Sequence, residues 1–314
     1  MGVLPMGMDI LPASEDRIFK TILISPEAKP FLMKLIAGLI GRNVIDVTVH
    51  SNELPISDIG EKAERFDVNC KIDDGSQVNL EMQASRMEED IGEKHKNIKS
   101  RSIYYLCDLH SSQPARGQQR YDHLVRTYQV TFCSYTVFPH RKEYINSFSM
   151  RHDADNELLH DAVRAVIVEL SKLEDIIRKP IEMMTDLEKF SVFFEYAANP
   201  KYREKVNKVI ESEEVLVVAS NLLMSISQDE RERAIFRSRK KFQMDHASDM
   251  ATAEDRGERI GREKGIVEGR EKGIVEGEAR GIAQMARRLK EEGTLSIEDI
   301  ARLSGLTIAE IEEL

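Results

Sequence analysis

The stretch from Arg65 to Ala84 constrains the fold most, because apolar and polar residues alternate along two segments that flank a turn. A period of two is typical of half-buried β-strands, so the stretch predicts a β-hairpin. Directly opposed residues of an antiparallel pair point to the same side, and the register must therefore match apolar with apolar side chains. This condition excludes a two-residue turn and predicts the three-residue loop Asp73-Asp74-Gly75, with Gly75 in the left-handed conformation.

The same register predicts a repulsive pair in the hairpin. It sets Asn69 opposite Asn79 and Asp67 opposite Glu81, and it puts Gln83 one step further along the strand. Two carboxylates that face each other across a strand pair destabilise it by roughly 0.2–1 kcal/mol. A hard cation between the oxygens or a solvent-exposed strand face would each account for the pair. Because Glu81 lies in an apolar strand that a helix and a basic segment follow, the sequence favours the cation.

These residues resemble a known family, the PD-(D/E)XK nuclease family transposases, also called recombination-promoting nucleases. The resemblance rests on Asp67 in RFDV, on Glu81 and Gln83 in NLEMQ, and on Asp16 and Lys20 in EDRIFKTIL. The later segments IVELSKL and GREKGIVEGREKGIVEGEARG fit as well, in the same order, over nearly the whole chain. In the wider superfamily the third active-site residue is usually Lys. Here it is Gln83, which can hold a water molecule or a phosphate oxygen but carries no charge.

The resemblance implies an α/β fold with a restriction-endonuclease-like mixed-sheet core, flanking helices and a helical C-terminal extension. It implies a metal-dependent DNA endonuclease with a role in recombination, mobile elements or phage defence. Carboxylates that hold Mg²⁺ or Mn²⁺ neutralise phosphoryl oxygens and activate a water molecule, as hydrolysis of a phosphodiester requires. The alternatives are a catalytically degenerate nuclease fold that binds DNA, and a protein-interaction module that works through the helical tail.

The residues assigned to this chemistry follow from the hairpin and the resemblance together. The expected catalytic residues are Asp67, Glu81, Gln83 and Asp16. The expected metal ligands are Asp67, Glu81 and the backbone carbonyl of Met82. Asp16 either adds a water-mediated ligand or is an ordinary first-turn acid of a helix.

Four further residues are expected to contact the substrate, namely Lys20, Lys99, Arg101 and Tyr104. Lys99 and Arg101 belong to a basic cluster between residues 94 and 126. This cluster is either a solvated helix face or a wall that faces the phosphates of DNA.

Periodicity and composition predict five segments along the chain. They are a tail over 1–13, a nuclease-like core over 14–175, a helical region over 176–255, a glycine-rich charged helix over 256–290 and a helix–turn–helix-like tail over 291–314. The expected helices include one capped by Ser14, Phe31–Ile40 and Ile91–His110, and the expected strands include Val44–Val49, Val125–Phe138 and Tyr144–Met150. The period of Ala162–Leu170 fits a helix as well as a strand, and the resemblance to the family implies a strand there. The repeat REKGIVEG spaces glycines four residues apart, so this helix either pairs with another copy in a homodimer or acts as a loose spacer.

The composition limits the class of protein and its partners. No apolar run approaches the roughly 20 residues that span a bilayer, so we expect no membrane partner and a cytoplasmic location. The net charge of −10 argues against a general nucleic-acid coat, although a local basic groove remains compatible with it. The three cysteines are scattered and lie in apolar contexts, which predicts reduced, buried thiols rather than a structural zinc site.

Overall fold

The computed structural model describes residues 2–50, 68–84, 91–113, 121 and 124–314. In this part of the chain a six-stranded mixed sheet has the order β1-β2-β3-β4-β6-β5. The strands are β1 (Val47–His50), β2 (Val68–Ile72), β3 (Gln77–Gln83), β4 (Thr127–Cys133), β5 (Ile145–Ser149) and β6 (Val163–Glu169). Strands β3, β4 and β6 run parallel, and β1, β2 and β5 are antiparallel to their neighbours. The mixed sheet is as the sequence predicted.

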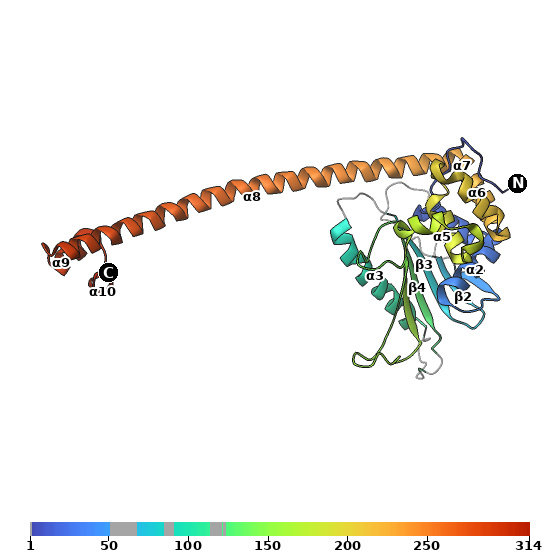
Figure 1. The fold of residues 1–314 in the computed structure, drawn as a ribbon, viewed down its shortest axis with the longest axis horizontal. Coiled ribbons are helices and arrows are strands. Elements are labelled where there is room, and N and C mark those ends of the chain that lie inside the picture. The colour runs from blue at the N-terminus through green and yellow to red at the C-terminus, as the bar shows by residue number, and fades with distance from the viewer. Residues whose placement is uncertain (1, 51–67, 85–90, 114–120, 122–123) are drawn as a thin grey trace. The chain divides into compact units, whose positions relative to one another are not determined.

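Helices cover both faces of the sheet. Figure 1 shows α3 (Ile91–Ser111) on one side of β3 and β4, and the other helices of the domain on the opposite side. The latter are α1 (Asp16–Ile24), α2 (Lys29–Ile40), α4 (Glu174–Arg178), α5 (Asp186–Tyr196), α6 (Arg203–Glu211) and α7 (Glu214–Gln228). Short 3₁₀ turns connect them at η1 (Pro26–Ala28), η3 (Leu170–Lys172), η4 (Ile181–Met183) and η5 (Pro200–Tyr202).

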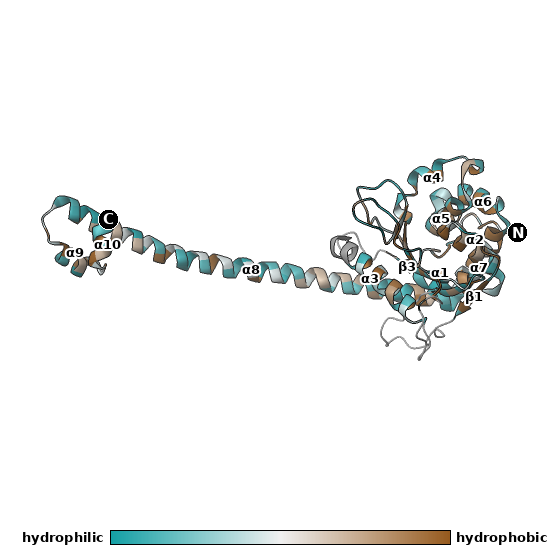
Figure 2. Cartoon of the chain, turned by 90° about the horizontal axis from the view of Figure 1, so that it is seen from below, coloured by the Kyte–Doolittle hydropathy of each residue, from teal (hydrophilic) through white to brown (hydrophobic). Residues whose placement is uncertain are grey.

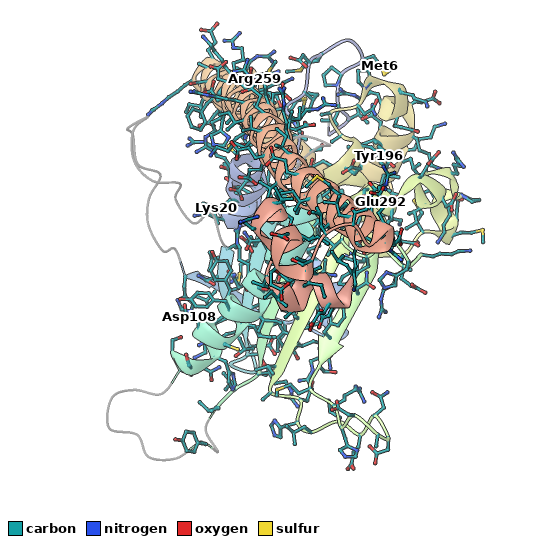
Figure 3. The ribbon with its side chains drawn as sticks, turned by 90° about the vertical axis from the view of Figure 1, so that its left-hand side faces the viewer. Met6, Lys20, Asp108, Tyr196, Arg259 and Glu292 are labelled. Atoms are coloured by element: carbon teal, nitrogen blue, oxygen red, sulfur yellow. The ribbon has the colours of Figure 1, made fainter. Side chains whose placement is uncertain are left out.

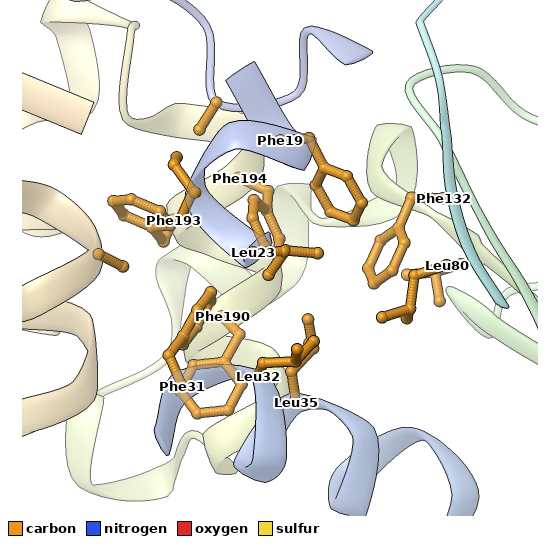
Figure 4. Packing of buried hydrophobic residues seen from close by; sticks show 14 of the residues in the cluster. Phe19, Leu23, Phe31, Leu32, Leu35, Leu80, Phe132, Phe190, Phe193 and Phe194 are labelled. Carbon is orange, nitrogen blue, oxygen red and sulfur yellow. The ribbon is translucent and has the colours of Figure 1, made fainter. Parts of the chain in front are cut away.

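The face opposite α3 carries the main hydrophobic core. Alternate residues of β3 and β4 point into it, and they meet phenylalanines from α1, α2 and α5 (Figure 4). The ring centroids of Phe19 and Phe132 lie 5.2 Å apart, and those of Phe31 and Phe190 lie 5.0 Å apart. Full burial of such a side chain contributes about 1.5–3 kcal/mol, so these rings anchor the helical layer to the sheet.

The face toward α3 is polar, although it is equally buried. Asn79, Gln129 and Thr131 are buried there, and Asn79 Nδ2 donates to Gln129 Oε1 at 2.8 Å. Ser102 of α3 lies with its Oγ 3.2 Å from Thr131 Oγ1. Buried polar groups are retained where they find hydrogen-bond partners, and this face supplies them from two strands and one helix. The sheet therefore separates the main apolar core from a layer that is polar around Asn79 and Thr131 and apolar around Ile98.

The predicted hairpin register is confirmed where it is described. Asn69 lies opposite Asn79, and Gly75 has a φ of 84°, the left-handed conformation that the three-residue loop requires. The N–H of Ile72 donates to the carbonyl of Ser76 at 3.0 Å and closes the loop. Asp67 lies outside the described residues, so its position opposite Glu81 stays a prediction.

Strands β1, β4, β5 and β6 are each shorter than predicted, and side chains explain the limits of β1 and β4. β1 begins at Val47 because the N–H groups of Ile45 and Asp46 donate to Asp73 Oδ1, at 2.9 and 3.4 Å, instead of to a strand. β4 ends at Cys133 rather than Phe138. Beyond it, the N–H of Phe138 donates to the Glu169 carboxylate at 2.9 Å, so this segment leaves the ladder.

Two smaller predictions were wrong. Glu15, not Ser14, caps α1, because the longer carboxylate reaches the N–H of Ile18 at 3.1 Å. Cys107 is exposed, whereas Cys70 and Cys133 are buried as expected. Helix α3 matches its predicted range closely, and Gly41 ends α2 as expected.

The chain divides into two compact units, Met1–Lys240 and Lys241–Leu314. The first includes residues 2–13, whose Leu4 and Ile10 are buried in the main core. Helix α8 (Glu230–Glu292) begins in the first unit and ends in the second, and Figure 2 shows it mainly in hydrophilic colours. The finer division into five segments stays a prediction.

The second unit ends in a small helical module. Helices α9 (Ile297–Ser304) and α10 (Ile308–Glu313) pack on the end of α8 through Ala286, Ile300 and Ile311. Ser296 and Thr307 cap the two short helices as the sequence predicted. Over the described residues, no helix has both the length and the apolar surface needed to cross a bilayer.

Candidate active site

Glu81 is a buried carboxylate on the polar face of a central strand. Its side chain is 2% exposed, and it lies opposite Thr131 of β4. Two residues further, Gln83 lies opposite Cys133, which in turn lies opposite Glu169 of β6. These three residues form a row where the parallel strands β3, β4 and β6 end. The carboxyl ends of parallel strands are the edge at which open α/β sheets place their sites.

Arg101 of α3 joins Glu81 and Gln83 into one hydrogen-bonded group. Its Nη2 donates to Glu81 Oε1, and its Nη1 donates to Gln83 Oε1 at 3.3 Å. Gln83 Nε2 in turn donates to Glu81 Oε1 at 2.7 Å. The guanidinium only donates and the carboxylate only accepts, so the Gln83 amide has its nitrogen toward Glu81 and its oxygen toward Arg101.

The electrostatics keep this arginine charged. Burial by itself lowers the pKa of Arg101, but the charge of Glu81 and the neighbouring Tyr105 raise it, and the net pKa lies above the ordinary value. The Arg101 side chain is partly exposed, whereas Glu81 is not. The pair therefore holds a buried negative charge against a positive charge that reaches solvent.

Two further groups border the site and stay protonated. Burial, followed by the charges of Glu169 and Glu81, raises the pKa of the Cys133 thiol far above its usual range. Burial is also the largest cause that raises the pKa of the Tyr135 phenol, and the adjacent Cys133 raises it further. The thiol and the phenol are therefore both neutral in the metal-free protein at neutral pH.

The other predicted substrate-binding residues of α3 contact aromatic rings. Tyr104 is 60% exposed, and its ring centroid lies 5.8 Å from that of Tyr105. Tyr105, which the sequence analysis did not single out, has its ring centroid 5.4 Å from Arg101 Cζ. Lys99 extends over the ring of Phe138, with Nζ 4.6 Å from the centroid.

The remaining predicted residues lie on other elements. Asp16 and Lys20 are half-buried and one turn apart on α1, which packs against β2 and β3 (Lys20 is labelled in Figure 3). The side chain of Met82 is buried in the apolar core, so only its backbone carbonyl is available to a site. Their roles, like that of Asp67 outside the described residues, stay predictions.

A second buried carboxylate, Glu169, has a structural role that its charge alone did not indicate. Its Oε1 accepts from the N–H groups of Val137 and Phe138 at 2.6 and 2.9 Å. Its Oε2 accepts from Asn146 Nδ2 at 2.8 Å and from Lys172 Nζ at 2.7 Å. The spacing of Glu169 and Lys172 in VELSKL, three residues apart at a strand end, was the available signal for this pair.

The donors at the strand edge suit a hard divalent cation. Carboxylate and amide oxygens are the ligands that Mg²⁺ and Mn²⁺ prefer, and Glu81 and Gln83 supply both kinds. Glu81 is already neutralised by a cationic group in this structure, as a buried carboxylate requires. Over the described residues, no group of three or more His, Cys, Asp or Glu side chains forms a metal site, so a complete ligand set needs a further residue such as Asp67.

Comparison with known proteins identifies one family. A family model described as PD-(D/E)XK nuclease family transposase matches residues 13–253. The match spans more than half of the chain and includes the whole sheet and helices α1 to α7. The searches of curated proteins and of solved structures each gave no significant match.

Proposed function

The chain belongs to the PD-(D/E)XK nuclease family transposases, and on this premise we propose that it is a metal-dependent DNA endonuclease that hydrolyses phosphodiester bonds. One observation carries the proposal within the family. The buried carboxylate of Glu81 lies at the carboxyl end of a central parallel strand, with Gln83 and Arg101 hydrogen-bonded to it. Recombination, mobile-element biology or phage defence is the proposed setting.

Asp67 and Glu81 would hold the Mg²⁺ or Mn²⁺ ion, with the backbone carbonyl of Met82 as a further ligand. When bound, the ion would polarise the scissile phosphate and lower the pKa of a bound water molecule. Asp16 adds a water-mediated contact in this proposal. The proposed ligands are all oxygen atoms, as a hard cation prefers.

The chain's own polar groups orient and neutralise the substrate. Gln83 has an amide that can hold a water molecule or a phosphate oxygen. Arg101, which reaches both Glu81 and solvent, is placed to neutralise a phosphate next to the reacting bond. Lys20, Lys99 and Tyr104 contact more distant parts of the DNA backbone in this proposal.

A second candidate function is supported by the Arg101–Glu81 ion pair itself. In this alternative Arg101 remains the permanent counter-ion of Glu81, and the fold binds DNA without a metal ion and does not cut it. Gln83 in place of the superfamily's lysine is consistent with that alternative. It predicts that DNA binding is independent of divalent metal.

Plasmid cleavage separates the two candidates. We compare the wild type, Asp67→Ala and Glu81→Gln, each with Mg²⁺ and with chelator, and use Glu182→Gln, an exposed carboxylate, as the matched control. We expect nicking or linearisation by the wild type and the control only with metal, and its loss in both site variants. Absence of cleavage by the wild type in Mg²⁺ and in Mn²⁺ would favour the DNA-binding alternative.

A further inference from the structure

A cluster of aromatic and basic side chains lies beside the candidate active site. It consists of Lys99, Phe138, His140, Arg141 and Phe148, called here the Phe138 cluster. The ring centroids of Phe138 and Phe148 are 5.4 Å apart, and Arg141 Cζ lies 5.8 and 5.9 Å from the two centroids. Phe138 is buried beneath the others, whereas Phe148 is 37% exposed. The cluster therefore presents a ring and a guanidinium to solvent together.

The register places this cluster on the same face of the sheet as Glu81. Asn146 of β5 bonds to Glu169, which shares a row with Gln83 across β3, β4 and β6. Phe148 follows Asn146 by two residues, so both side chains lie on that face. Lys99, on the same helix as Arg101, places its Nζ over the Phe138 ring. Helix α3 and this face of the sheet therefore carry both the proposed catalytic edge and the cluster.

Buried charges hold the segment that carries the cluster. Glu169 accepts hydrogen bonds from the N–H groups of Val137 and Phe138. Lys172 Nζ donates to the carbonyls of Phe138 and Arg141 at 2.9 and 2.8 Å, and it also bonds to Glu169. A lysine and a glutamate that satisfy four backbone groups in one loop fix its conformation. The cluster is therefore preorganised rather than formed on contact with a ligand.

The local charge suits an anion in a protein that is acidic overall. Lys99 and Arg141 of the cluster are exposed, and so is Lys142, which follows Arg141 in sequence, whereas Glu143 is the acidic residue next to them in sequence. The whole chain carries a formal charge of −10, so this basic patch contrasts with the rest of the chain. Exposed aromatic rings beside guanidinium groups stack nucleobases, whose faces are accessible only where they are unpaired.

We propose that the Phe138 cluster is a stacking platform for an unpaired base, and that the protein binds DNA with a single-stranded segment beside the bond it cleaves. The second part rests on the proposed nuclease function, whereas the first does not. Phe148 provides the ring on which the base stacks, and Arg141 contacts the same base or its phosphate. Phe138 positions both from beneath.

The test measures binding in chelator, so that cleavage plays no part. Fluorescence anisotropy compares a labelled single-stranded oligonucleotide with the duplex of the same sequence, and a fluorescent adenine analogue in the strand reports stacking by its quenching. We expect tighter binding of the single strand and quenching of the analogue. Phe148→Ala and Arg141→Ala should each weaken single-strand binding about 10- to 100-fold and leave duplex binding nearly unchanged.

Two controls separate stacking from loss of structure. Phe148→Tyr keeps an aromatic face and should bind as the wild type does, and Phe242→Ala removes a more exposed ring of α8 and should have no effect. Equal affinity for single strand and duplex, or unchanged binding by Phe148→Ala, would overturn the proposal. If the protein quenches the adenine analogue but does not cleave plasmid DNA, the nuclease function is refuted and the proposal of a stacking platform still holds.

Discussion

Arg101 of α3 forms an ion pair with Glu81 of β3 across the polar face of the sheet, and the same guanidinium also donates to Gln83. The arginine thereby supplies the positive charge that a buried carboxylate needs before any substrate or metal is present. Its partly exposed end can exchange this partner for a phosphate. A divalent cation on Glu81 would compete with Arg101 for the same oxygen and release the arginine toward DNA.

Arg101→Ala should destabilise the metal-free protein by about 3 kcal/mol, because it leaves the Glu81 carboxylate buried without its counter-ion. Mg²⁺ should restore part of this free energy of unfolding if Glu81 binds the ion. Urea denaturation in chelator and in Mg²⁺ measures both effects. Arg178→Ala, which removes an exposed ion pair with Glu174, is the control and should change stability by less than about 0.5 kcal/mol. Equal stability of Arg101→Ala and wild type in chelator would contradict the prediction.

Glu169→Gln should lower the free energy of unfolding by about 3 kcal/mol. The carboxylate accepts hydrogen bonds at both oxygens, whereas the amide would turn its own N–H groups toward some of the same donors. The loop over residues 137–143 should lose its fixed conformation at the same time. Amide hydrogen exchange of Val137 and Phe138 reports that change, and urea denaturation reports the stability. Glu182→Gln is the exposed control. Protection of both amides at the wild-type level in the variant would mean that Glu169 does not hold the loop.

Glu195 makes stability depend on pH in the direction opposite to that of most carboxylates. Burial raises its pKa to about 7 from an ordinary value of 4.5. The folded state therefore binds the proton more tightly, and the contribution of Glu195 to stability decreases as pH rises from 4.5 to 7. Glu195→Gln should leave stability unchanged at acidic pH and raise it by up to about 3 kcal/mol above neutral pH. Thermal denaturation at both pH values checks this, and a parallel shift at both would contradict it.

Gly265→Ala and Gly273→Ala should each stabilise α8 by about 1 kcal/mol, because alanine is the better helix former and nothing lies within 4 Å of the added Cβ. Amide hydrogen exchange across residues 257–281 should slow by about fivefold for each substitution. Gly305→Ala is the opposing control. It should destabilise the end of α9, because the φ of 74° at this position is unfavourable for a residue with a side chain. Faster exchange in the two helix variants would instead indicate that the glycine stripe packs against a second copy of the chain.

The hairpin was predictable because its information is local. Period-two alternation and one glycine determine the pairing of Asn69 with Asn79, and the structure agrees with it. The contact between Glu81 and Arg101 was not predicted as such, because it depends on how a helix twenty residues later docks on the strand. The proximity of Tyr105 and Arg101, by contrast, is local, since residues four apart on a helix lie on the same face.

The ends of elements were predicted least well, because side chains intervene there. Asp73 takes the N–H groups that would have extended β1, and Glu169 takes those that would have extended β4. Both carboxylates are distant in sequence from the strands that they shorten. The glycine-rich segment also continues α8 without a break, although each glycine there lowers helix propensity.

The two unlike faces of the sheet affect how the protein can change over time. Substitutions among the phenylalanines around Phe19 and Phe132 alter folding stability and do not touch a group that meets the substrate. Substitutions around Asn79 and Thr131 alter the polar layer and leave the hydrophobic packing in place. A lineage of such proteins can therefore change its thermal tolerance at the first set of positions and the surroundings of Glu81 at the second. Laboratory evolution could select for one property without losing the other.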